Sequence, residues 1–211
     1  MIECMHLPYC SSLRAVFIDK RSTLESSHFG TWVNQIESEL TRCFPATHSH
    51  DWLGQLTAND MMTTVILCKI HSIKESNTCP INSTFSCDNI KPSRIVAICA
   101  FHKVKEQPQG DTIYVWNICK FLGVPEYKYT AGMLLYALQR YTRKDSNVKR
   151  ISLNVDLQSP TANIAIKSYK KAGMEISKLR PGGLSDERLR ENPGRFTRMD
   201  LNVTDSKARQ A

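Results

Sequence analysis

The turn that precedes one helix offers the clearest chemistry in this chain. In "GVPEYKYTAGMLLYAL", residues 123–138, an apolar strand ends near a proline and a helix follows. The chain enters that helix through Lys128, Tyr129, Thr130, Ala131 and Gly132. The first turn of a helix leaves backbone N–H groups without partners at the positive end of its dipole, and small residues let an anion approach them closely. The segment therefore predicts an anion site of the kind that holds phosphate groups.

The overall charge agrees with an anionic partner but does not identify it. The chain of 211 residues has a formal net charge of +8 and a pI near 9.1, which suits nucleic acid, a membrane surface or a phosphate-bearing cofactor. No aromatic-basic motif of a nucleic-acid-binding module is present. The longest apolar runs, such as residues 94–101, are shorter than the roughly 20 residues of a membrane-spanning helix. We therefore expect neither nucleic acid nor a membrane as partner.

Cysteine usage and the N-terminus predict a cytoplasmic protein. The first residues lack the hydrophobic region of a secretory signal, so the eight cysteines are expected to be reduced thiols. Among them Cys68, Cys99 and Cys119 lie in apolar segments, where cysteine behaves as a small hydrophobe. Cys79 and Cys87 lie in a polar loop and would pair only in an oxidising compartment. The segments "CMHLPYC" and "HSHD" lack the paired spacing of zinc ligands, so no metal is expected.

Hydrophobic periodicity predicts an alternation of strands and helices. Two runs rich in β-branched residues are expected to be strands buried on both faces, and the turn residues at 107–111 predict an antiparallel hairpin. A helix stop is expected at Gly173. The predicted strands are 13–19, 63–70, 94–104, 112–122, 150–156, 174–179 and 196–203, and the predicted helices are 28–44, the one after the turn at 128–132, and 160–172.

Two motifs within residues 112–176 resemble those of the GNAT superfamily of acyl-CoA N-acyltransferases. The first is the strand, "VPEYK", the glycine-bearing turn and its helix, and the second is a helix carrying "NIAIKSYKKAGM". The resemblance implies one α/β domain over 1–203, with a long loop or insertion at 72–93 and a disordered tail at 204–211. Its central sheet would be mixed, mostly antiparallel, flanked by helices and splayed between the fourth and fifth strands.

The resemblance also implies an acetyl-CoA site. The family motif places Lys128 at its Arg or Gln position and Ala131 and Met133 at its glycine positions, with Gly132 between them. A turn shorter by one residue would instead put Gly132 at the last glycine. Strand amides near Phe121 would pair with pantetheine in the splay. The implied cofactor-binding residues are Phe121, Leu122, Gly123, Val124, Lys128, Tyr129, Thr130, Ala131, Gly132, Met133 and Asn163.

Catalytic roles follow from the second motif. Tyr169 corresponds to the tyrosine that protonates the departing CoA thiolate, and a tyrosine with a pKa near 10 still holds its proton at neutral pH. The strand 112–122 contains no carboxylate to act as general base. His102 is our first candidate because of its reference pKa near 6.5, and Glu126, Asp156 or a water relay are the alternatives.

The implied activity is direct transfer of the acetyl group from acetyl-CoA to a primary amine, without a metal. The acceptor is a protein lysine, a protein N-terminus or a small molecule, and the protein is expected to be a monomer or homodimer. The alternative is a catalytically weak protein of the same fold that binds acyl-CoA or a partner. Between Lys178 and Arg198, six basic residues face three acidic ones, which predicts a preference for anionic acceptors.

Overall fold

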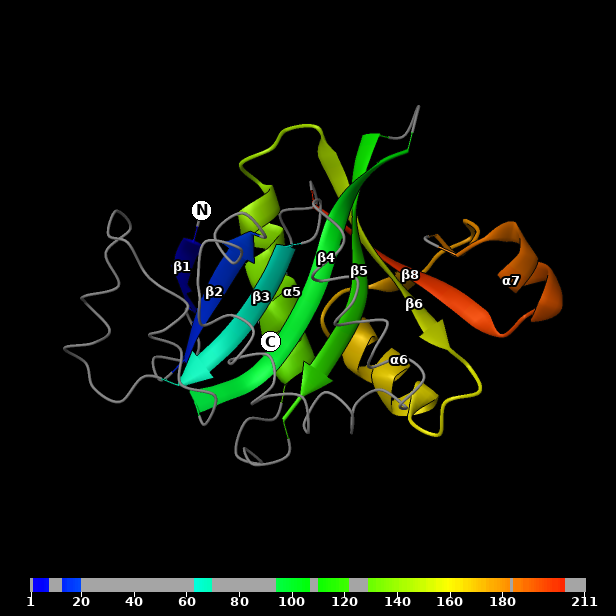
Figure 1. The fold of residues 1–211 in the computed structure, drawn as a ribbon, viewed down its shortest axis with the longest axis horizontal. Coiled ribbons are helices and arrows are strands. Elements are labelled where there is room, and N and C mark those ends of the chain that lie inside the picture. The colour runs from blue at the N-terminus through cyan, green and yellow to red at the C-terminus, as the bar shows by residue number, and fades with distance from the viewer. Residues whose placement is uncertain are drawn as a thin grey trace, which may run out of the picture. The chain divides into compact units, whose positions relative to one another are not determined.

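A computed structural model describes residues 2–7, 13–19, 63–69, 94–106, 110–121, 129–182 and 184–203 (Figure 1). These form two compact units, one from Met1–Ala100 with Asn117–Thr130 and the other from Phe101–Trp116 with Ala131–Ala211. The predicted helix at 28–44, the segment 72–93 and the tail 204–211 lie outside the described residues. The single domain over 1–203 stays a prediction.

The first unit is built on antiparallel strands. It contains β1 (Ile2–His6), β2 (Leu13–Asp19), β3 (Thr63–Lys69), the first half of β4 (Ile95–Glu106) and the second half of β5 (Gly110–Lys120). β2 pairs antiparallel with both β1 and β3. The central residues of β3 and the first seven of β4 are buried, which confirms the prediction of strands covered on both faces. β1 was not predicted.

The second unit contains the helices. It comprises the rest of β4 and β5, with α5 (Thr130–Thr142), β6 (Val148–Asp156), α6 (Ala162–Lys171), β7 (Glu175–Ile176), α7 (Asp186–Glu191) and β8 (Phe196–Asn202), in the strand order β4-β5-β6-β8-β7. Gly173 adopts a φ of 93° just after α6, as predicted for a helix stop. The strand predicted at 174–179 is shorter than expected. The loop after it contains α7, whose Ser185 accepts the N–H of Arg188 at 3.2 Å as an N-cap.

The sheet opens between β5 and β6. These strands pair in parallel from Asp111 and Val148 to Val115 and Leu153, where their register ends. β6 continues to Asp156 paired antiparallel with β8. Because β1 adds one strand before those predicted, β5 and β6 are the fourth and fifth predicted strands. The mixed, mostly antiparallel sheet with its splay at this place is confirmed.

Side chains of the second unit separate onto two faces of its strands, as the two-residue period of a strand requires. Phe101 of β4 contacts Tyr141 of α5 with ring centroids 5.8 Å apart, so α5 lies on the face that Phe101 occupies. The buried apolar residues of this face are Phe101, Ile113, Val115, Ile151, Leu153, Val155 and Met199. The opposite face holds His102, Glu106, Thr112, Tyr114, Trp116, Arg150, Ser152, Asn154, Arg198 and Asp200. Polar chemistry is therefore concentrated on one face of the sheet.

Candidate functional site

The first turn of α5 has the features of an anion site. Thr130 is buried, whereas Ala131, Gly132 and Met133 are half-buried, and the first turn carries no acidic residue. A Cβ built on Gly132 would meet the Cβ of Ala172 at 3.8 Å, an ordinary contact. The predicted phosphate turn therefore lies beside the C-terminal end of α6, which carries Tyr169. These residues fit a phosphate group because nothing negatively charged on this turn opposes it.

Tyr169 lies in the last turn of α6 and is half-buried. Its carbonyl oxygen accepts the N–H of Met174 at 3.0 Å, which closes the end of the helix. Asn163, in contrast, is exposed in the first turn of α6. At 1.5 Å per residue, Asn163 lies roughly 13 Å along the helix from Ala172. Tyr169 is thus at the end of α6 that adjoins α5, and Asn163 is near the other end.

Of the other residues predicted to bind acetyl-CoA, the structure describes only Tyr129 and Phe121. Leu122, Gly123, Val124 and Lys128 lie outside the described residues, as does Glu126. Tyr129 is 68% exposed just before α5.

Phe121 follows β5, and its backbone N–H donates to the carbonyl oxygen of Val96 at 2.9 Å. That amide is used within the sheet, so the expected pairing with pantetheine cannot involve it.

The candidate general bases have defined partners. The indole Nε1–H of Trp116 donates to Nδ1 of His102 at 2.5 Å, and burial lowers the pKa of His102. Asp156 accepts from Arg195 at 2.7 Å and 3.1 Å. Hydrogen bonding from Arg195 holds the pKa of Asp156 below its usual value, so this carboxylate is a weak base.

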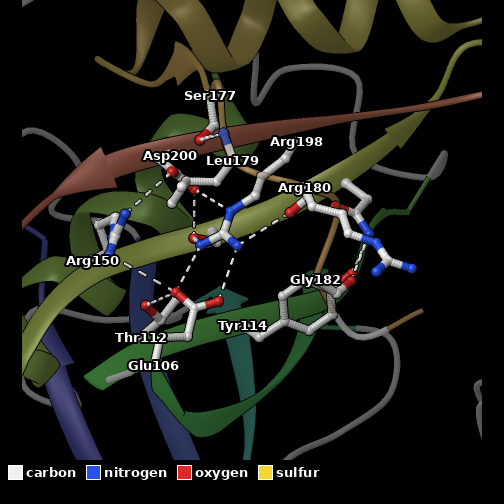
Figure 2. A network of polar contacts seen from close by, with 12 residues as sticks. Glu106, Thr112, Tyr114, Arg150, Ser177, Leu179, Arg180, Gly182, Arg198 and Asp200 are labelled. Carbon is white, nitrogen blue, oxygen red and sulfur yellow. Dashed lines mark hydrogen bonds and ion pairs between the residues drawn. The ribbon is translucent and has the colours of Figure 1, made fainter. Parts of the chain in front are cut away.

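A network centred on Arg198 occupies the polar face (Figure 2). The side chain of Arg198 is only 3% exposed, and its guanidinium donates to both carboxylate oxygens of Glu106, at 2.9 Å and 3.0 Å. Its Nε donates to Asp200 at 2.8 Å. Thr112 donates to Glu106 at 2.8 Å and Ser152 to Asp200 at 2.5 Å. A buried cation is here held by two carboxylates from different strands.

The network is electrically balanced. Hydrogen bonds from Arg198 lower the pKa of Glu106. Burial alone would raise the pKa of Asp200, but hydrogen bonds from Arg198 and Ser152 outweigh it, and the pKa lies below its usual value. Arg150 is 3.9 Å from each carboxylate. The positive charges of the two arginines therefore cancel the negative charges of the two ionised carboxylates. The sequence offered no signal for this network, because Glu106 and Arg198 are 92 residues apart.

A pocket of about 420 Å³ adjoins this network. It is lined by Lys105, Glu106, Leu179, Arg180, Pro181, Gly182 and Arg198. The side-chain amide of Asn154 donates to the carbonyl oxygen of Gly182 at 2.8 Å and to the hydroxyl of Tyr114 at 2.7 Å, which ties the pocket wall to the strands. Figure 2 shows the ring of Tyr114 close to Gly182. Burial raises the pKa of Tyr114 to about 12, so it stays neutral.

Much of the predicted positive charge of the segment 177–198 is neutralised locally. Arg180 pairs with Asp186 and Arg195 with Asp156, while Arg198 pairs with Glu106 and Asp200. These partners leave less charge to attract an anionic acceptor than the six-to-three count suggested.

Cysteine placement requires one correction. We expected Cys119 to be a reduced thiol, but it is disulfide-bonded, and that prediction is wrong. Cys68 and Cys99 are free and buried.

No cluster of three His, Cys, Asp or Glu side chains within the described ranges is arranged to hold a metal ion. None of the helices described here has the length and apolar character needed to cross a membrane.

Comparisons with known proteins place the fold. Neither a protein-family model nor a curated protein matches the sequence. Among solved structures, GCN5 of Tetrahymena is similar with a TM-score of 0.55 and 12% identity over 96% of both chains. NAA60 of Arabidopsis thaliana, solved with acetyl-CoA, has a TM-score of 0.54 and 11% identity over 91% of this chain and 99% of its own.

A GNAT-family protein from Desulfovibrio desulfuricans has a TM-score of 0.51 and 10% identity over 96% of this chain and 98% of its own. Identities this low show the fold alone. With the splay between β5 and β6 and the α5 turn beside α6, they establish that this chain has the GNAT fold.

Proposed function

We propose that this chain is an acetyl-CoA-dependent N-acetyltransferase that acts on a primary amine. The observation that carries the proposal is the close approach of the first turn of α5 to the end of α6, where a Cβ added to Gly132 would lie 3.8 Å from the Cβ of Ala172. The turn proposed to bind an anion thus lies beside a helix end that bears a half-buried tyrosine, Tyr169. NAA60, which shares the fold, was solved with acetyl-CoA bound. Donor binding and proton donation would thus come from two adjoining helix ends.

The donor would be held mainly by backbone groups. The pyrophosphate would accept hydrogen bonds from backbone N–H groups of the first turn of α5, where Gly132 lets it approach closely. Lys128 would add a positive charge before this turn. When bound, acetyl-CoA supplies a thioester whose carbonyl carbon is open to attack by an amine.

The transfer would proceed in one displacement. The amine nitrogen of the acceptor forms a bond to the thioester carbon, and the carbon–sulfur bond breaks as sulfur takes its electron pair. Tyr169 donates its hydroxyl proton to that sulfur. Glu106, Asp156 and Asp200 all have lowered pKa values, so they are poor proton acceptors. Nδ1 of His102 already accepts the indole N–H of Trp116, so the acceptor nitrogen would release its proton to water. Tyr169 would regain its proton from water.

The acceptor would be a lysine or N-terminal amine of a protein, or a small-molecule amine. The polar face of β4, β5 and β6 offers hydrogen-bonding groups to an acceptor. Because the charges of the Arg198 network are balanced, the network favours neither a cationic nor an anionic acceptor. A panel should therefore include lysine peptides, peptides with free N-termini, polyamines and acidic amino acids.

Tyr169→Phe tests the proposal. With the best acceptor of the panel, we expect turnover to fall by about 10²- to 10⁴-fold, the range for a positioned acid, with unchanged acetyl-CoA affinity in calorimetry. Tyr141→Phe is the matched control, because Tyr141 contacts Phe101 on the apolar face of the strands. This variant should keep full activity.

Unchanged turnover in Tyr169→Phe would remove this residue from the mechanism. A wild-type protein that binds acetyl-CoA but acetylates no member of the panel would refute the enzymatic proposal and favour a binding role.

A further inference from the structure

The hydrogen bond between Trp116 and His102 determines which nitrogen of the histidine is left for other partners. The indole N–H is only a donor, so Nδ1 of His102, 2.5 Å away, must be the acceptor. A neutral imidazole carries its one proton on the other nitrogen. His102 is therefore neutral here, with its proton on Nε2.

The surroundings of His102 favour that neutral form. Its ring lies 5.7 Å, centroid to centroid, from the rings of both Tyr114 and Trp116. Trp116 does not titrate, and the pKa of Tyr114 is raised to about 12, so neither ring of β5 brings a charge to the histidine. Val104, the next residue on the same side of β4, is apolar. Burial lowers the pKa of His102, and protonation at Nδ1 would also break the bond from Trp116.

The position of His102 relates this nitrogen to the proposed reaction. Trp116 is the first residue of β5 beyond the parallel register with β6, which ends at Val115. His102 lies across from it on the polar face, at the start of the splay. No described residue forms a hydrogen bond with Nε2 of His102. A half-buried N–H group at this place can donate to a substrate, but it cannot accept a proton.

We propose that His102 donates a hydrogen bond from Nε2–H to an oxygen of the acceptor substrate, and that Trp116 is the positioning residue that holds this tautomer. The inference rests on the proposed acetyltransferase activity and deepens it. It implies acceptors that carry a carbonyl or carboxylate oxygen near the reacting amine, as peptides and amino acids do and polyamines do not. His102 is then a binding group and not the general base.

Nitrogen-15 NMR of the histidine rings tests the tautomer without any assay of activity. We expect His102 to show a protonated Nε2 and a bare Nδ1, and to titrate below its usual 6.5. Trp116→Phe should mix the two tautomers and raise the pKa of His102. Tyr114→Phe, which keeps its ring beside the histidine, is the control and should leave the tautomer unchanged. A wild-type spectrum with the proton on Nδ1 would overturn the assignment.

Kinetics of two His102 variants separate donation from base catalysis. The amide N–H of Gln can replace Nε2–H but cannot take a proton, so with an amino-acid or peptide acceptor His102→Gln should keep kcat/KM within about 3-fold of wild type. His102→Phe should lose about 10-fold, the effect of one hydrogen bond, mostly in KM. With a polyamine acceptor both variants should match the wild type.

Two outcomes distinguish the failure of each idea. Equal losses of about 10²- to 10⁴-fold in both His102 variants would make the residue a general base and overturn the proposal. A wild-type protein without activity on any amine would refute the acetyltransferase function, while the NMR result would still decide the tautomer.

Discussion

Removing the guanidinium of Arg198 should destabilise the protein strongly. Its side chain is 3% exposed, and its partners Glu106 and Asp200 are 23% and 14% exposed. Loss of one partner from a buried ion pair costs about 3–5 kcal/mol because it leaves an uncompensated charge. Arg150, 3.9 Å from each carboxylate, would offset part of this. For Arg198→Met we expect the lower end, about 3 kcal/mol, or a fall in Tm of about 6–12 °C in a chain of this length.

Thermal and urea unfolding followed by circular dichroism would measure this change. Arg180→Met is the control, because the side chains of Arg180 and its partner Asp186 are 59% and 75% exposed, and an exposed pair contributes at most about 1 kcal/mol. Adding Glu106→Gln to Arg198→Met should recover part of the lost stability, because it removes the unpaired charge. An Arg198→Met protein as stable as Arg180→Met would refute the reasoning.

The stabilisation by Arg198 should also depend on pH with a defined sign. Glu106 and Asp200 have lowered pKa values in the folded protein. Their contribution to the free energy of unfolding is therefore complete at a pH above the ordinary carboxyl pKa of about 4. It is lost as the pH falls through the lower pKa values of the folded protein. The difference in unfolding free energy between wild type and Arg198→Met should shrink when the pH is lowered from neutral. A difference that stays constant down to the lowest pH measured would contradict the ion-pair explanation.

Two further predictions concern donor binding and thiol reactivity. Gly132→Ala places a Cβ 3.8 Å from that of Ala172, so the fold should tolerate the substitution. The added methyl group should weaken acetyl-CoA binding about 10-fold in calorimetry and leave the binding of pantetheine unchanged. Equal effects on both ligands would argue against phosphate binding at this turn. Burial raises the pKa of Cys68 to about 12 and also raises that of Cys99. Both thiols should therefore resist Ellman's reagent at pH 8 and react only after denaturation. Rapid labelling of the native protein would show that they are accessible.

Patterns among residues close in the chain were enough to predict most of the described elements and to propose where the donor binds. The β-branched runs of β3 and β4 predicted strands covered on both faces, since such runs are too short for typical helices. The turn before α5 and the spacing around Tyr169 are also local, because each lies within one short segment. β1 escaped prediction, since "IECMH" has no strong pattern of its own and becomes a strand by pairing with β2.

Contacts between distant segments decided the chemistry of individual side chains. His102 was proposed as a base from its residue type, but Trp116, 14 residues away on the neighbouring strand, occupies one of its nitrogens and leaves a donor. The basic count of the segment 177–198 predicted a preference for anionic acceptors, but Arg180, Arg195 and Arg198 are paired with Asp186, Asp156 and Glu106. The protonation and availability of a polar group depend on the atoms within hydrogen-bonding distance and on burial from water, and only the folded chain determines which atoms those are.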